Sequence, residues 1–129
     1  MAMIQVNDPT VLTEVEAAFA RYERALTSND VETLDALFYN NPLTIRYGMT
    51  ESLYGYAEIK AFRAARVTQG LSRTIERTVI TTYGKDFAVA STLFRREAGK
   101  VGRQMQTWVR TEDGWNVVAA HVSVIKECN

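Results

Sequence analysis

The segment "LTIRYG", residues 43–48, contains the first residue whose position suggests chemistry. Apolar and polar residues alternate along it, which is the pattern of a strand with one face on a core, so Arg46 lies on the opposite face. If that face meets water, Arg46 is an ordinary surface residue, but if helices cover it, Arg46 points into a cavity and needs an anionic partner. The partner is either an internal acid, with Glu51, Glu76 and Glu97 as candidates, or a ligand carboxylate gripped by the planar guanidinium.

The last predicted hairpin carries a second group of polar side chains. With residues 111–114 as its loop, Trp108 pairs with Val117, and the same register pairs Gln104 with His121. One face would then carry Trp108, Gln106, Gln104, His121 and Ser123. A few hydrogen-bonding groups on an apolar wall are typical of a small-molecule pocket, although a slip of one residue would exchange the two faces.

Two further candidates, His121 of this hairpin and Tyr22 of the first predicted helix, each have two interpretations. His121, the only histidine, is either a satisfied core residue or a pocket group that donates to an anion or moves a proton near neutral pH. Tyr22 shares a helical stripe with other apolar residues, namely Leu12, Val15, Phe19 and Leu26. The Tyr22 hydroxyl either bonds locally within the core or points into a cavity under the helix.

The helix predicted at residues 56–67 places two arginines on its apolar face. Arg63 and Arg66 share that face with Ile59 and Phe62. The arginines either extend their stems around the core edge or line a positively charged pocket mouth. All five aspartates occupy predicted caps, helix surfaces or turns, so no inward aspartate is expected as a base. Any chemistry therefore depends on arginine, tyrosine, histidine and glutamine, and we expect neither a metal nor another cofactor.

The elements that must position these residues fall into two parts. Helical spacing dominates up to residue 70, with Asp8 and Pro9 at the start of the first helix. Asn29 and Glu32 form a candidate capping box for a second helix. The remaining predicted elements are that second helix at 30–38, short strands at 43–48 and 51–55, and long strands at 71–83, 86–97, 102–110 and 115–125. Their short connections make the long strands an antiparallel meander.

This order of elements predicts an α+β fold in which three N-terminal helices pack in a strongly curved antiparallel sheet. Residues 1–129 suit a single domain. The net charge is zero and the basic residues are scattered, which argues against a nucleic-acid partner. No apolar run approaches the roughly 18 residues that span a bilayer, so no membrane partner is expected. Without a secretory signal, and with Cys128 as the only cysteine, we expect a cytoplasmic protein.

Several motifs resemble those of a known family. The segments are "RYERAL", "LFYNNPLTIRYG", "ESLYGYAEIKAFRAAR", "GRQMQTWVR" and "GWNVVAAHVSVI", which together extend over nearly the whole chain. They resemble the AtzH-like family of the nuclear transport factor 2-like, or SnoaL-like, superfamily. That resemblance implies a cystatin-like cone, and usually a homodimer, which an apolar outer sheet face would also favour.

The resemblance further implies a function in bacterial cyanuric acid and s-triazine catabolism, linked to an amidase. The implied activity is that of a metal-independent amidohydrolase, which converts 1,3-dicarboxyurea to allophanate with release of carbon dioxide and ammonia. The alternative is a non-catalytic accessory protein that binds a carboxylated ureide for the partner amidase. Both interpretations need a pocket for a small anion.

The same resemblance implies which residues form the pocket. Tyr22 and Arg46 would be catalytic. The substrate-binding residues would be Trp108, His121, Arg63, Arg66, Gln106 and Ser123. The sequence lacks the inward carboxylate of isomerase relatives such as ketosteroid isomerase, which argues against proton abstraction from carbon and favours an anionic substrate.

Overall fold

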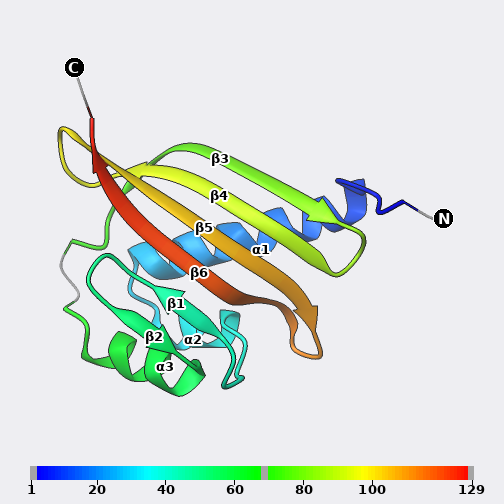
Figure 1. Ribbon diagram of the computed structural model, residues 1–129, viewed down its shortest axis with the longest axis horizontal. Coiled ribbons are helices and arrows are strands. Elements are labelled where there is room, and N and C mark those ends of the chain that lie inside the picture. The colour runs from blue at the N-terminus through cyan, green and yellow to red at the C-terminus, as the bar shows by residue number, and fades with distance from the viewer. Residues whose placement is uncertain (1–2, 68–69, 128–129) are drawn as a thin grey trace.

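Three helices cover one face of a six-stranded sheet in the computed structural model, which describes residues 3–67 and 70–127 (Figure 1). The helices are α1 (Pro9–Thr27), α2 (Val31–Leu37) and α3 (Tyr56–Ala65). The strands are β1 (Ile45–Tyr47), β2 (Ser52–Tyr54), β3 (Thr74–Tyr83), β4 (Phe87–Arg95), β5 (Lys100–Thr111) and β6 (Gly114–Lys126). The predicted α+β class is therefore confirmed.

The order of strands in the sheet is β2-β1-β6-β5-β4-β3. Strands β3 to β6 form the predicted antiparallel meander, and β1 and β2 extend it beyond β6. However, β1 runs parallel to β6, so the prediction of an entirely antiparallel sheet is wrong for this pair. The two strands are far apart in sequence, and no hairpin sets their relative direction.

Local capping explains where the first two helices begin. The Asp8 side chain accepts hydrogen bonds from the backbone N–H groups of Thr10 and Val11, at 3.0 and 3.3 Å, as its predicted N-cap role requires. The N-cap of α2 is Asp30 rather than Asn29, so the predicted capping box is wrong. Asn29 instead adopts a left-handed conformation, with φ of 52°, just after α1 ends.

The predicted stripe of α1 packs on the concave side of the sheet. Four of its five predicted members, Val15, Phe19, Tyr22 and Leu26, are buried, whereas Leu12 is only half-buried. Val11 and Ala25, which were not predicted, are buried on the same helix. Trp108 and Val117 form part of the same core and are 0% exposed. Burial of this apolar stripe fixes the face of α1 that looks toward the sheet.

A bulge in β6 changes the predicted register of the final hairpin. Trp108 pairs with Val117, as predicted, but the next pair along the ladder is Thr107 with Ala119. Val118 is therefore an extra residue in β6. Because successive strand residues point to opposite faces, one extra residue reverses the orientation of every later side chain relative to the prediction.

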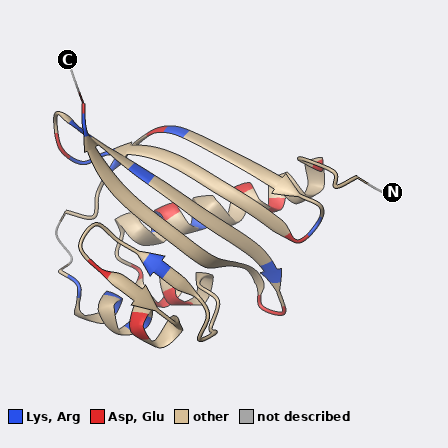
Figure 2. Cartoon of the chain, viewed as in Figure 1, with Lys and Arg blue, Asp and Glu red and all other residues tan. Residues whose placement is uncertain are grey.

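Positions of basic residues (blue) and acidic residues (red) are interspersed along the chain (Figure 2). They occur in helices, turns and strand ends, and the lysines and arginines do not cluster in one segment. Within the described part of the chain, no helix is both long enough and apolar enough to cross a membrane.

Candidate functional site

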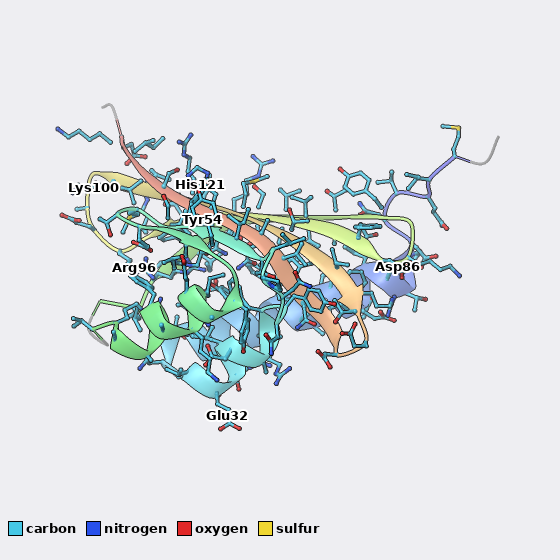
Figure 3. All side chains as sticks on the ribbon, turned by 60° about the horizontal axis from the view of Figure 1, so that its bottom comes forward. Glu32, Tyr54, Asp86, Arg96, Lys100 and His121 are labelled. Carbon is cyan, nitrogen blue, oxygen red and sulfur yellow. The ribbon has the colours of Figure 1, made fainter. Side chains whose placement is uncertain are left out.

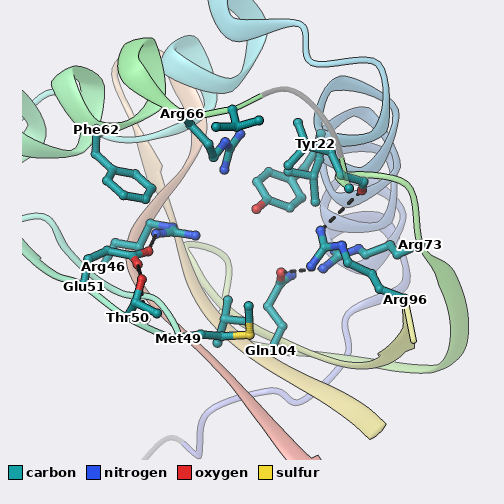
Figure 4. A pocket seen from close by; sticks show the side chains of 15 residues that line it. Tyr22, Arg46, Met49, Thr50, Glu51, Phe62, Arg66, Arg73, Arg96 and Gln104 are labelled. Carbon is teal, nitrogen blue, oxygen red and sulfur yellow. Dashed lines mark hydrogen bonds and ion pairs between the residues drawn. The ribbon is translucent and has the colours of Figure 1, made fainter. Parts of the chain in front are cut away.

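A cavity of about 270 Å³ lies on the concave side of the sheet (Figure 4). It is enclosed by α1, the end of α3, the loop between β1 and β2, and the inner faces of the long strands. The residues that line it are Tyr22, Leu26, Arg46, Met49, Thr50, Glu51, Phe62, Arg66, Val67, Gly70, Leu71, Arg73, Arg96, Gln104 and Val122. The lining combines apolar side chains with several polar ones, four of them arginines, so the pocket suits a small polar ligand better than an apolar one.

Two of the four arginines that line this pocket have glutamate partners. Arg46 Nη1 donates to Glu51 Oε1 at 2.6 Å, and the two side chains are 14% and 17% exposed. Arg73 forms an ion pair with Glu23 and donates through Nη1 to Gln104 Oε1 at 3.2 Å. The positive charges of these two arginines are therefore compensated within the protein.

The other two arginines, Arg66 and Arg96, form no ion pair with any residue in the ranges 3–67 and 70–127. Arg66 caps the C-terminal end of α3, and its Nε and Nη2 atoms are buried without a described hydrogen-bond partner. Arg96 directly follows β4 and donates through Nη2 to the Leu71 carbonyl at 3.3 Å. Its guanidinium also lies 5.1 Å from the centre of the Phe94 ring.

Burial and repulsion both disfavour the positive charge on these two arginines. Burial is the largest influence on the pKa of Arg66 and lowers it, and the nearby charges of Arg63 and Arg46 lower it further. Partial burial of its guanidinium also lowers the pKa of Arg96, with Arg73 as the next contributor, although the residue as a whole is exposed. Guanidinium nevertheless stays protonated at neutral pH, so the pocket holds two cations that an incoming anion would stabilise.

Tyr22 is 5% exposed and projects from α1 toward the same pocket. Figure 4 shows its hydroxyl pointing into the pocket, opposite the loop that carries Glu51. None of the side chains drawn there forms a hydrogen bond with it. Of the two interpretations of Tyr22, the position of the hydroxyl favours the one in which it points into a cavity under the helix.

Arg46 lies on the inner face of β1, next to α3. Its guanidinium is 5.6 Å from the centre of the Phe62 ring. The apolar side of the same strand faces outward, since Leu43 is 82% exposed and Tyr47 is also exposed, so the predicted core face of this segment is wrong. Arg46 does point into the cavity, but Glu51, one of the internal acids considered as its partner, already binds it.

Arg63 does not line the pocket, in contrast to the expectation for the two arginines of α3. Its Nη1 atom donates to Asp35 Oδ1 on α2 at 2.6 Å, and its guanidinium lies 4.7 Å from the centre of the Phe38 ring. At 5% exposure it is a buried ion-pair residue between two helices. Helical periodicity places Arg63 and Arg66 on one face, but it cannot show that Arg63 binds Asp35 whereas Arg66 lines the pocket.

Trp108 and Gln106 also lie outside the lining of this cavity. Trp108 Nε1 donates to Gln106 Oε1 at 3.1 Å, and both side chains are buried deeper in the core. The sequence predicted that Trp108 and Gln106 share one face of the sheet, but their side chains bond to each other and do not line the cavity. The residue of that face that does reach the cavity is Gln104, which binds Arg73.

His121 and Ser123 point to the outer face of the sheet because of the bulge in β6. His121 pairs with Met105 and is exposed, and Ser123 accepts a hydrogen bond from Arg103 Nε at 3.2 Å. Figure 3 shows His121 on the side of the sheet away from the helices, whereas Arg96 lies on the helix side. The prediction that His121 and Ser123 share a face with Gln104 is therefore wrong.

Sequence reasoning missed Arg73 and Arg96 as pocket residues. The structure places Arg96 directly after β4, on the inner face that continues from the buried residues Ala90, Thr92 and Phe94. The sequence does not mark this face, because Val89 and Leu93 make the opposite face apolar as well. No pattern marks Arg73 either, which precedes β3. Among the described residues, no group of three or more histidine, cysteine, aspartate or glutamate side chains has an arrangement that could hold a metal ion.

Comparison with known proteins identifies the family. The family model described as AtzH-like matches residues 4–128, nearly the whole chain. The chain belongs to the AtzH-like family. A comparison with curated proteins gave no match for this AtzH-like protein.

Solved structures similar to this AtzH-like protein share its fold throughout. A protein of unknown function from Pectobacterium atrosepticum is 58% identical, with a TM-score of 0.91 over 94% of this chain and 95% of that chain. A cystatin-like fold protein from Burkholderia xenovorans is 48% identical, with a TM-score of 0.92 over 97% and 99% of the two chains. A nuclear transport factor 2-like protein from Salmonella enterica is 26% identical, with a TM-score of 0.74 over 93% and 94%. The predicted cystatin-like cone is thus confirmed.

Proposed function

We propose that the pocket binds a small urea that carries two carboxylates, and that it converts 1,3-dicarboxyurea to allophanate. The observation behind this proposal is that Arg66 and Arg96 face the pocket without a described acidic partner. Arg66 has buried guanidinium nitrogens without a described partner, and a ligand carboxylate would remove that penalty. Arg96 is an exposed cation that lines the pocket and would bind a second carboxylate. Two such cations match a ligand with two carboxylates.

The atom balance defines the step. Dicarboxyurea and allophanate contain the same number of nitrogen atoms and differ by one molecule of carbon dioxide. Release of ammonia as well, which the family resemblance led us to expect, would leave too little nitrogen to form allophanate. The proposed reaction is therefore decarboxylation: the bond between nitrogen and the departing carboxylate breaks, its electron pair stays on nitrogen, and nitrogen takes up one proton.

Tyr22 is the proposed proton donor for that nitrogen. Its hydroxyl points into the pocket (Figure 4), whereas the carboxylate of Glu51 is engaged by Arg46. The positive charges of Arg66 and Arg96 would hold the substrate carboxylates, and the Arg46–Glu51 ion pair would border the urea without adding net charge. In this scheme Arg46 acts as a paired pocket cation rather than as a free carboxylate receptor.

The alternative is a binding protein that carries a carboxylated ureide to a partner amidase. One observation favours it: both glutamates paired with pocket arginines, Glu23 and Glu51, are engaged and do not serve as a free general base. A pocket of this kind would hold the ureide without changing it. The decarboxylation scheme remains our first choice because it needs a proton donor rather than a base.

A single assay separates these functions. Purified protein is mixed with freshly generated dicarboxyurea labelled with carbon-13, and allophanate, carbon dioxide and ammonia are followed over time. Allophanate and carbon dioxide formed in equal amounts, faster than the spontaneous decay, would support the enzyme. Saturable binding without acceleration would support the carrier, and neither binding nor acceleration would contradict both.

A further inference from the structure

The Glu51 carboxylate fills a position in the pocket that a ligand carboxylate could otherwise take. Its Oε1 accepts from Arg46 Nη1 at 2.6 Å. Its Oε2 accepts from Thr50 Oγ1 at 2.7 Å and from the Thr50 backbone N–H at 3.2 Å. Both oxygens therefore have hydrogen-bond partners, and Glu51 is only 17% exposed.

Gly48 provides the space that this arrangement needs. A Cβ atom at residue 48 would lie 1.7 Å from Glu51 Oε1, so the carboxylate passes directly over the glycine. The backbone of the turn is closed by a hydrogen bond from the Gly48 N–H to the Glu51 carbonyl, at 2.9 Å. A larger residue at 48 would displace the end of the Glu51 side chain, because that end is flexible and the backbone is held.

Hydrogen bonds and the neighbouring cation keep Glu51 ionised. Burial alone would raise the pKa of its carboxyl group, but the hydrogen bond from Thr50 and the interaction with Arg46 outweigh it and lower the pKa. Glu51 is thus an anion at neutral pH and cancels the charge of Arg46. Glu23 cancels the charge of Arg73 in the same way, which leaves Arg66 and Arg96.

From this charge balance we infer that Glu51 is a specificity-determining residue, which limits the pocket to ligands with two carboxylates. The inference rests on the proposed function, because it assumes that the pocket binds small carboxylates. Glu51 occupies Arg46 and would repel a third carboxylate. Specificity of this type depends on a repulsive element as well as on attractive contacts.

A series of stable ligands tests this role. Glutarate has its two carboxylates separated by the same number of chain atoms as dicarboxyurea. Butyrate has one carboxylate, and tricarballylate is glutarate with a third carboxylate on its central carbon. Their affinities are measured by calorimetry at constant ionic strength and mildly alkaline pH, where all ligand carboxylates are ionised. The proteins are the wild type, Glu51→Gln, Gly48→Ala and Glu16→Gln, the last of which removes an exposed glutamate on α1.

We expect the wild type to bind glutarate more tightly than butyrate or tricarballylate. Glu51→Gln should raise the affinity for tricarballylate relative to glutarate by about tenfold, since it exchanges a repulsion for a free cation. Gly48→Ala should change the ratio in the same direction while keeping the carboxylate in the protein, so it tests the idea even if Glu51→Gln does not fold. Glu16→Gln should leave the ratio unchanged.

Two results would overturn the role of Glu51. One is a wild type that prefers tricarballylate, and the other is an unchanged ratio in both loop variants. With glutarate still bound by the wild type, either result leaves the proposed function standing. If the wild type binds neither glutarate nor dicarboxyurea, both the proposed function and the role of Glu51 are contradicted.

Discussion

Arg63 Nη1 lies 2.6 Å from Asp35 Oδ1, and this ion pair joins α3 to α2 behind the pocket. The Arg63 side chain is 5% exposed and the Asp35 side chain 14%. Replacing one partner of such a pair leaves the other charge buried and unpaired. The pair therefore holds in place the helix whose C-cap residue, Arg66, lines the pocket.

Asp35→Asn should lower the free energy of unfolding by about 3 kcal/mol, because Arg63 would lose its charged partner. Urea unfolding followed by tryptophan fluorescence measures the change. The matched control is Asp113→Asn in the exposed β5–β6 turn, which should have almost no effect. Equal stabilities of the two variants would show that the ion pair contributes little.

Tyr22→Phe tests the proposed proton donor. The variant keeps the buried ring and removes the hydroxyl, so the unfolding midpoint should stay near that of the wild type. Turnover of dicarboxyurea should fall by about 10²- to 10⁴-fold, the usual range for loss of an acid or base. Tyr83→Phe, at an exposed position of β3, is the control and should retain full turnover. Full turnover in Tyr22→Phe would show that Tyr22 contributes to packing and is not the proton donor.

Arg66→Met should separate stability from function. The substitution removes a buried cation that has unpartnered nitrogen atoms, so the free energy of unfolding should stay the same or rise by about 1 kcal/mol. Affinity for glutarate should fall by at least about tenfold, since one carboxylate loses its partner. Arg21→Met, at an exposed position of α1, should change neither quantity. A destabilised variant with unchanged glutarate affinity would show that Arg66 is structural.

The outer face of the sheet supports our expectation of a homodimer. A row of paired residues crosses it, formed by Val79, Ser91, Met105, His121 and Tyr47. Val79, Met105 and Tyr47 are 45%, 51% and 37% exposed, which leaves apolar area for a second copy to cover. Light scattering at micromolar concentration should give a dimer for the wild type and for Met105→Leu, but a monomer for Met105→Glu. A monomeric wild type in this measurement would contradict the expected homodimer.

Local signals explain which parts of this fold the sequence could predict. Asp8 and Pro9 mark the start of α1 through a cap that needs only neighbouring backbone groups. The turn after Thr111 likewise set the correct pairing of Trp108 with Val117. In both cases the deciding interactions are short-range, so the residue types alone are informative.

The positions of several site residues depend on structural features that no short stretch of the sequence marks. The bulge at Val118 lies in a run of valine and alanine, where no change of polarity marks the extra residue, and it reversed the predicted side of His121. The partner of Arg63 is Asp35, which belongs to another helix and looked like a surface residue in the sequence. Long-range contacts of this kind appear only once the elements are packed.

The most direct test of a pocket built for two carboxylates is a crystal structure of the protein with glutarate. We expect one glutarate carboxylate within hydrogen-bond distance, about 3 Å, of the Arg66 guanidinium and the other within the same distance of Arg96, with the Arg46–Glu51 pair intact. Saturating glutarate that binds outside this pocket, or inside it without contact to either Arg66 or Arg96, would contradict the account.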